Sequence, residues 1–283
     1  MGYEKLYNPS LQFQSREAFI EYMNQDQPVR PANIVNIVAI NQGKKPLTMD
    51  EPHTSVLSPQ EVSDLIGKGH IVIDTRSEAA FGAGHIPGAY NIQLTSAEFE
   101  QRVGWVTPLE IPMILVMEND ADVQKALNAL AFLGLDQRVK GFLVGGMRAW
   151  VNAGFPHTTV PQLSVTQLNE HLNNSLNMQV LDVRETSEWD DGHIEQAHYM
   201  NYKFLRDQIE ALTLAPDQHI SVVCAGGLRS STACSILLMN GYKHIYNVTG
   251  GMTSWSAAGL PMVDAEGNAV TRLHAPKPEW FEL

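Results

Sequence analysis

The chain contains one unit twice, and this duplication constrains its fold more than any other feature. The run IVIDTRSEAAFGAGHIPGAYNI matches the later run QVLDVRETSEWDDGHIEQAHYMN, and a second pair, VGGMRAWVNAGFP and TGGMTSWSAAGLP, follows in the same order. Two copies of one structural unit therefore follow each other along the chain. Asp74, Arg76 and His85 recur 108 residues later as Asp182, Arg184 and His193, and Gly146 and Trp150 recur 105 residues later as Gly251 and Trp255.

Each copy alternates strand and helix patterns. A capped helix opens it, at Ser58 with Glu61 and at Ser164 with Gln167, and a β-branched run ending in Asp-x-Arg follows. A Gly-His-Ile turn, a second strand, a loop, a helix, a short strand and a Gly-Gly-Met turn before an aromatic helix complete the unit. Strands separated by helices need crossover connections. We therefore predict an α/β fold of two tandem domains, each a central parallel sheet flanked by helices on both faces.

The predicted domains are a short N-terminal extension (1–56), a first domain (57–160) and a second domain (161–283). The boundary between the copies falls where prolines and threonines interrupt the periodicity. In the extension we expect one helix, capped by Ser15, and then a partly extended run over 27–49. After residue 264 we expect an irregular tail, with Trp280 and Phe281 docking in a groove.

Composition excludes several classes of partner. A net charge of -12 argues against nucleic acid and against an anionic membrane surface, because phosphate binding needs clustered Lys and Arg. No apolar run approaches the roughly 20 residues that span a bilayer. The first ten residues lack a basic start followed by an apolar core, so we expect a cytoplasmic location.

The second copy places Cys224 directly after the apolar run ISVV, before a glycine-rich loop and a helix. In open parallel sheets, ligands bind beyond the carboxyl ends of the strands. Helix N-termini and nearby cations bring thiol pKa values from about 8.5 down to roughly 3.5–7.5. We therefore predict that Cys224 is a nucleophile in an active loop, 224–230. Cys234 lies farther along the helix, and we expect it to fill the core.

The other loop residues are assigned around this thiol. Arg229 is expected to orient the anionic end of a substrate, and the backbone amides of the loop to hold the transferred group. We interpret Asp182 and Arg184 as a buried scaffold ion pair and His193 as a turn-stabilising residue; direct catalytic roles are the alternative. No metal site or cofactor is expected. The predicted substrate-binding residues are Ala225, Gly226, Gly227, Leu228 and Ser230.

The first copy has lost these groups. Met117 stands at the position of Cys224, and Asp122 at that of Arg229. The acidic residues Glu118, Asp120 and Asp122 would repel an anionic donor; metal binding by them is a weaker alternative, because no histidine accompanies them. We expect the first domain to be a structural unit or a recognition surface.

These motifs together resemble the rhodanese-like domains. The resemblance rests on Asp182-Val-Arg184, Gly192-His193-Ile194, the loop CAGGLRS and Gly250-Gly251-Met252 with Trp255. It implies sulfur transfer through a persulfide on the loop cysteine. The implied donor is thiosulfate or a low-molecular-weight persulfide such as glutathione persulfide, and the acceptor is a thiol, sulfite or cyanide.

The chain departs from the family pattern at the mouth of the site. Rhodanese-like loops often carry an arginine directly after the cysteine, where this chain has Ala225. Thiosulfate-specialised tandem members carry a basic residue upstream, where this chain has Glu188. The second copy also lacks the Pro-Gly that follows His-Ile in the first. These departures make the mouth less basic than thiosulfate would favour.

A second, shorter resemblance involves residues 8–47. They look like the closing segment of the metallo-β-lactamase-fold persulfide dioxygenases that occur fused to rhodanese units. The metal-binding His-x-His-x-Asp-His motif of those enzymes is absent from this sequence. The resemblance implies a rhodanese-bearing portion or shortened relative of such a fusion that binds no iron or zinc, with a persulfide dioxygenase-type domain or protein as partner.

Two other functions remain open from the residues alone. Cysteine phosphatases use a similar loop but place five residues between Cys and Arg, whereas Cys224 and Arg229 are separated by four. A shorter ring suits a single sulfur atom better than a phosphoryl group. The other alternative is a non-catalytic binding or regulatory module.

Overall fold

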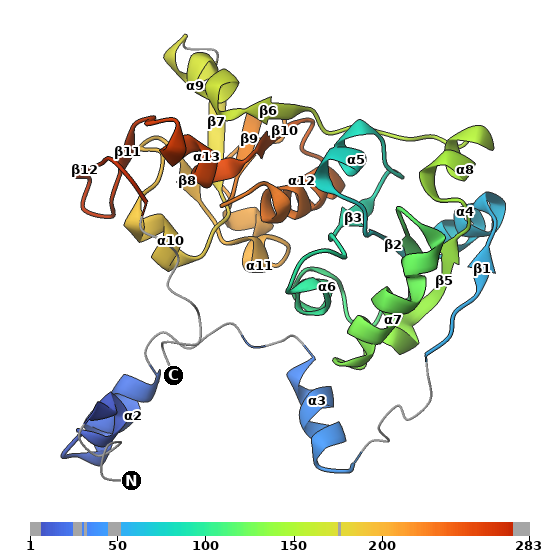
Figure 1. Cartoon of the computed structure of the whole chain (residues 1–283), viewed down its shortest axis with the longest axis horizontal. Coiled ribbons are helices and arrows are strands. Elements are labelled where there is room, and N and C mark those ends of the chain that lie inside the picture. Colours follow the sequence, from blue (N-terminus) through green and yellow to red (C-terminus); the bar gives the residue numbers. More distant parts are fainter. Residues whose placement is uncertain (1–6, 25–29, 31–32, 45–51, 175–176, 274–283) are drawn as a thin grey trace. The chain divides into compact units, whose positions relative to one another are not determined.

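The computed structural model describes residues 7–24, 30, 33–44, 52–174 and 177–273 (Figure 1). The chain divides into two units, 1–31 and 32–283. The first unit contains the 3-10 helix η1 (Pro9–Leu11) and helix α2 (Arg16–Asn24), neither of which has a buried residue. The backbone N–H of Ala18 donates to Ser15 Oγ at 3.1 Å, which confirms the predicted cap.

The second unit holds two five-stranded parallel sheets with the same strand order, as the repeat predicts. Long β-branched runs form the central strands, which are buried on both faces. The first sheet has the order β1-β5-β4-β2-β3, and the second has the order β6-β10-β9-β7-β8. The strands of the first sheet are β1 (Val56–Leu57), β2 (Ile71–Asp74), β3 (Ala89–Asn91), β4 (Met113–Val116) and β5 (Val139–Leu143); those of the second are β6 (Gln162–Ser164), β7 (Met178–Asp182), β8 (His198–Tyr199), β9 (His219–Val223) and β10 (His244–Thr249).

Helices cover both sheets, and their starts follow the predicted capping signals. Ser58 with Glu61 and Ser164 with Gln167 form complete capping boxes. Within the described residues, no helix is long and apolar enough to cross a membrane. The first domain contains α4 (Pro59–Gly67), α5 (Glu78–Ala83), α6 (Phe99–Val106), η2 (Asp120–Asp122), α7 (Val123–Ala131), η3 (Asp136–Arg138) and α8 (Gly146–Asn152); the second contains α9 (Val165–Asn173), α10 (Thr186–Asp191), α11 (Tyr202–Leu205), η4 (Ile209–Ala211), α12 (Leu228–Met239) and α13 (Gly251–Ala257).

Two expectations about the ends of the chain were wrong. Helix α3 (Ile34–Asn41) replaces the partly extended run, because tertiary contacts override its β-branched composition. The Asn33 side chain donates to the Leu133 carbonyl, and Ile40 lies beside Gly134. The tail after residue 264 is not wholly irregular, since β12 (Ala269–Val270) pairs with β11 (Met262–Val263) in an antiparallel hairpin. Trp280 and Phe281 lie outside the described residues.

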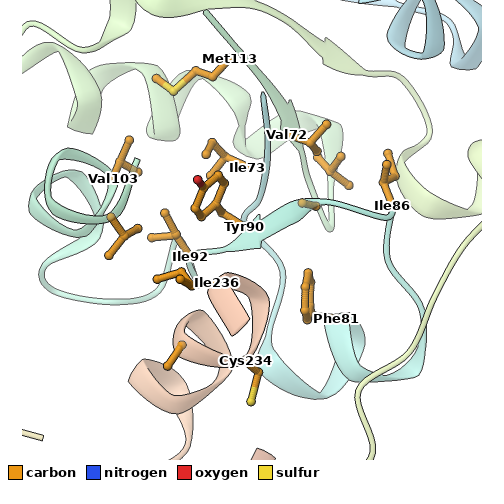
Figure 2. Packing of buried hydrophobic residues seen from close by; sticks show 14 of the residues in the cluster. Val72, Ile73, Phe81, Ile86, Tyr90, Ile92, Val103, Met113, Cys234 and Ile236 are labelled. Carbon is orange, nitrogen blue, oxygen red and sulfur yellow. The ribbon is translucent and has the colours of Figure 1, made fainter. Parts of the chain in front are cut away.

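One hydrophobic cluster runs through both domains, and a second, smaller cluster lies within the second domain. The buried cluster of the first domain continues into α12, so that Cys234 and Ile236 lie near Phe81 and Ile92 (Figure 2). This placement confirms Cys234 as a core residue. Successive residues of the linker bond with different domains. The N–H of Val160 donates to the Gly82 carbonyl of the first domain, and the Pro161 carbonyl accepts the N–H of Asn247 of the second.

Candidate active site

Cys224 lies between the carboxyl end of β9 and the start of α12, in the predicted strand-loop-helix arrangement. Its Sγ accepts the backbone N–H of Gly227 at 3.1 Å and lies 3.3 Å from Ser230 Oγ. The residue is only 1% exposed. Gly226 is the exposed residue of the loop, and a Cβ added there would meet nothing within 4 Å, so the loop is open at Gly226.

Gly227 gives the loop its shape. It is the N-cap of α12 and has a φ of +110°, in a region that L side chains rarely adopt. The N–H of Gly227 is the amide that donates to the Cys224 sulfur. The same helix N-terminus carries partial positive charge from its unpaired amides. Cys224 therefore lies where developing negative charge on sulfur is stabilised.

The Gly-Gly-Met turn anchors the first half of the loop. The N–H groups of Met252 and Thr253, in the first turn of α13, donate to the carbonyls of Cys224 at 2.8 Å and Ala225 at 3.0 Å. Gly251 has a φ of +49°, and an added Cβ would collide with the Cys224 carbonyl oxygen. From the sequence alone, this turn was assigned no role in the site. Its Gly-Gly pair was nevertheless a signal of a close backbone contact.

Arg229 is fully engaged by a carboxylate. Its Nη1 and Nη2 donate to the two oxygens of Glu188 at 2.6 and 2.7 Å. Burial raises the pKa of Glu188, but the hydrogen bonds and charge of Arg229 outweigh it and hold that pKa below its usual range. Burial lowers the pKa of Arg229, and Glu188 more than restores it. Glu188 thus neutralises the charge of Arg229, the residue that the sequence predicts to orient the anionic end of a substrate.

A chain of side-chain amides reaches Ser230 from the linker between the domains. The carbonyl of Val160 can only accept, so Gln162 Nε2 donates to it at 3.0 Å and Gln162 Oε1 accepts from Asn247 Nδ2 at 2.9 Å. Asn247 Oδ1 then accepts the Ser230 hydroxyl at 2.6 Å. This series of hydrogen bonds orients Ser230 Oγ toward the Cys224 sulfur. Sequence reasoning missed Asn247; a polar residue inside the strand HIYNVT was the available signal.

Asp182, Arg184 and His193 hold a neighbouring turn. Arg184 binds both carboxylate oxygens of Asp182 and donates to the Gly192 carbonyl at 2.8 Å. His193 Nδ1 lies 2.9 Å from the Trp189 carbonyl, and its ring stacks on the Trp189 ring. In the described part of the chain, the side-chain hydrogen bonds of the three residues go to this turn and to each other rather than to the 224–230 loop.

The corresponding loop of the first domain is built differently. Met117 follows β4 as Cys224 follows β9, and it is 1% exposed. Asp120 Oδ2 accepts the N–H of Gly145 at 2.9 Å, so one acidic side chain is used to close the loop. Among the residues that the structure describes, no three His, Cys, Asp or Glu side chains are placed to hold a metal ion.

Known proteins resemble the chain domain by domain. A sulfurtransferase of Allochromatium vinosum is 28% identical over 108 residues, which are 38% of this chain and 99% of that protein. The protein HIGH ARSENIC CONTENT 1, mitochondrial, of Arabidopsis thaliana is 34% identical over 90 residues, 28% of this chain and about half (53%) of that protein. The solution structure of a rhodanese-like domain from Anabaena is 29% identical, with a TM-score of 0.35, and covers 42% of this chain and 98% of that domain.

The family model described as "Rhodanese-like domain" matches two segments, residues 58–153 and 164–258. Each segment contains one of the two parallel sheets apart from its first, edge strand, and the second contains the Cys224 loop. Because the two segments together cover more than half of the chain, the protein belongs to the rhodanese-like domain family and carries that domain twice in tandem.

Proposed function

We propose that the protein is a rhodanese-type sulfurtransferase in which Cys224 carries a sulfane sulfur as a persulfide. The observation that carries this proposal is the contact between Gly227 N–H and Cys224 Sγ, 3.1 Å long, at the N-terminus of α12. Such an amide stabilises a thiolate before transfer and the terminal persulfide sulfur after it. The likeness to the Allochromatium vinosum sulfurtransferase over nearly its whole length supports the same reaction class.

The reaction consists of two displacements. The Cys224 thiolate attacks the sulfane sulfur of the donor, the S–S bond of the donor breaks, and the donor leaves as a thiolate or as sulfite with the electron pair. A thiol, sulfite or cyanide then attacks the outer sulfur of the persulfide. The Cys224 thiolate leaves and is ready for another cycle. The protein undergoes no net oxidation or reduction, so the proposed reaction needs no cofactor.

The proposed donor is thiosulfate or a low-molecular-weight persulfide such as glutathione persulfide. Arg229 is the residue that we propose to orient the anionic part of the donor, with the loop amides around Gly226 and Gly227 holding the sulfur. Because Glu188 neutralises Arg229 and Ala225 adds no charge, the mouth has little positive charge to offer a dianion. A low-molecular-weight persulfide fits this mouth at least as well as thiosulfate.

We also propose the setting that the sequence indicates. The net charge of -12 fits a cytoplasmic protein with small-molecule substrates rather than one that binds nucleic acid. The likeness of residues 8–47 to the end of a persulfide dioxygenase domain supports such a domain or protein as a partner. A dioxygenase of that class oxidises the outer sulfur of a persulfide to sulfite, so it would supply the acceptor for the Cys224 persulfide rather than the donor.

Cyanolysis tests the proposed activity. Protein treated with thiosulfate or glutathione persulfide and then with cyanide should release thiocyanate. Cys224→Ser should release none, whereas Cys234→Ala, which removes the other cysteine of the chain, should still transfer sulfur. Turnover of p-nitrophenyl phosphate without thiocyanate would instead support a cysteine phosphatase. The absence of both products would identify a non-catalytic binding module and overturn the proposal.

A further inference from the structure

Helix α12, whose first turn ends the active loop, is held by the first domain through buried hydroxyl groups. Ser231 Oγ donates to Asn91 Oδ1 at 2.6 Å, and Thr232 Oγ1 donates to the Asn91 carbonyl at 2.6 Å. The N–H of Asn91 in turn donates to Ser235 Oγ at 3.3 Å. All four residues are at most 1% exposed. Asn91, at the end of β3, thus contacts two successive turns of α12, and we call these four residues the domain clamp.

The first domain fixes the orientation of the Asn91 amide. Asn91 Nδ2 donates to the carbonyls of Asp74 at 3.1 Å and Arg76 at 3.0 Å, which can only accept. The Oδ1 atom must therefore face the other way, toward Ser231. Gln93 Nε2 donates to the same Oδ1 at 2.7 Å and approaches the Leu228 carbonyl at 3.4 Å. The clamp is consequently anchored in β2 and reaches the first residue of α12.

The second domain makes a different contact at the corresponding position. By strand register, Asn91 faces Asp74 as Tyr199 faces Asp182, and the Tyr199 hydroxyl bonds with Thr186 instead. Helix α12 is buried at every residue from Ser230 to Leu237, whereas its counterpart α7 buries only Ala126, Leu127 and Leu130 of its nine residues. The hydroxyl groups of Ser231, Thr232 and Ser235 therefore face Asn91 of the first domain rather than water.

The clamp lies next to the reacting sulfur. Ser231 directly follows Ser230, whose Oγ is 3.3 Å from Cys224 Sγ, and the N–H of Ser231 makes the first helical bond to the Gly227 carbonyl. A shift of Ser231 therefore moves the two groups that contact the sulfur. In Figure 2, Cys234 and Ile236 of α12 lie beside Phe81 and Ile92 of the first domain, so the apolar contacts hold the helix in the same place.

We propose that Asn91 is a positioning residue for sulfur transfer and that the first domain, which lacks a nucleophile of its own, serves as a fixed wall of the Cys224 site. This inference rests on the proposed sulfurtransferase function. The first domain acts through the start of α12: it holds in place the Gly227 amide, which donates to the Cys224 sulfur. Ser230 Oγ, whose proton goes to Asn247, is held beside that sulfur. Preorganised donors lose much of their effect when they are displaced by even a fraction of an ångström.

The test uses the full chain with Asn91→Leu, which keeps the side-chain size and removes the amide oxygen and the amide nitrogen of the side chain. We expect kcat for transfer to cyanide to fall about tenfold per native protein, with KM for the donor changed less than about twofold. Thr107→Val is the matched control, because Thr107 is also fully buried in the first domain and bonds only to Val103 and Arg138 there. Its kcat should stay within about twofold of the parent value.

A double-mutant cycle separates positioning from general destabilisation. If Asn91 acts through Ser231, then Asn91→Leu should have little further effect on kcat in a Ser231→Ala background. Fully additive effects in the cycle, or equal losses in Asn91→Leu and Thr107→Val at a temperature where both are folded, would overturn the proposal.

Alkylation keeps the proposal testable if the protein transfers no sulfur. Cys224 is 1% exposed in the clamped structure. Asn91→Leu should therefore raise the rate of Cys224 alkylation by iodoacetamide about fivefold, located by peptide mass, while Thr107→Val should not. An unchanged rate in Asn91→Leu would contradict the clamp whatever reaction the site performs. If the parent protein transfers no sulfur but Asn91→Leu raises the alkylation rate of Cys224, only the proposed function is contradicted and the clamp is supported.

Discussion

Arg229 and Glu188 form a bidentate ion pair, in which the two Nη atoms of the guanidinium donate to the two carboxylate oxygens at 2.6 and 2.7 Å. The two residues are 41 positions apart and come from α12 and α10. Bidentate pairs of this kind are strong and directional. The pair therefore fixes Arg229 beside the loop while cancelling the charge with which it would attract an anionic donor.

Removing that carboxylate should change donor preference. In Glu188→Gln the Arg229 charge is no longer neutralised, so KM for thiosulfate should fall several-fold relative to KM for glutathione persulfide. Glu195→Gln changes the net charge equally at an exposed position and should leave this ratio unchanged. Steady-state cyanolysis with both donors measures it. An unchanged or raised KM for thiosulfate in Glu188→Gln would show that Glu188 does not set the donor preference.

Gly251→Ala should damage the active loop directly. The added Cβ would collide with the Cys224 carbonyl oxygen in a left-handed backbone conformation, at a cost of about 1–3 kcal/mol of stability. Sulfur transfer per folded protein should fall at least about tenfold. Gly146→Ala places a Cβ in the same left-handed region against the Met117 carbonyl oxygen, in a milder clash, and should lower the melting temperature without a comparable loss of transfer. Equal transfer by the two variants would contradict the anchoring role of the turn.

Acid should destabilise the protein partly through His85. Burial, the largest effect, lowers the pKa of His85 from 6.5 to about 4, although the hydrogen bond to the Phe81 carbonyl opposes it. Between these values the unfolded chain binds more protons than the folded one, so the free energy of unfolding falls as the pH drops. The loss from this group amounts to about 3 kcal/mol by pH 4. Urea unfolding from pH 7 to 4 should show a shallower decline in His85→Gln; an identical decline would contradict this assignment.

Restoring a thiol to the first domain should not restore chemistry there. Met117→Cys places sulfur after β4, but that loop lacks the counterparts of Gly227 and Arg229, and α7 begins at Val123 behind the 3-10 helix η2. In a Cys224→Ser background, donor treatment should therefore add no sulfur to residue 117. A stable persulfide at that position would show that a thiol at the strand end is sufficient and that the glycines and arginine are dispensable.

The repeat and its strand patterns were enough to predict two parallel sheets. Central strands such as β9 are long β-branched runs, and a capping box marks α4 and α9. The edge strands β1 and β6 were missed, because two or three residues carry no measurable periodicity. The short strands β3 and β8 were missed for the same reason. These elements form only because a neighbouring strand supplies their hydrogen bonds.

The site was predicted as far as local sequence carries information. Cys224 and its loop are contiguous, so the strand end, the glycines and the helix start can be read together. The partners of the loop cannot be predicted from the local sequence. Glu188, Asn247 and Asn91 come from other strands and helices and contact the loop residues only in the folded protein. Their common signal is a polar residue that the fold buries or half-buries, which must find a hydrogen-bond partner.

The most direct test of the central claim is the intact mass of the protein after treatment with a sulfane donor and removal of excess reagent. The proposed function predicts a gain of one sulfur atom, about 32 Da, located on the peptide that contains Cys224, reversed by cyanide and absent from Cys224→Ser. Cys234 should remain unmodified, because it is fully buried in the core and burial raises the pKa of its thiol well above the usual value. No mass gain, or a gain that persists in Cys224→Ser, would contradict the account.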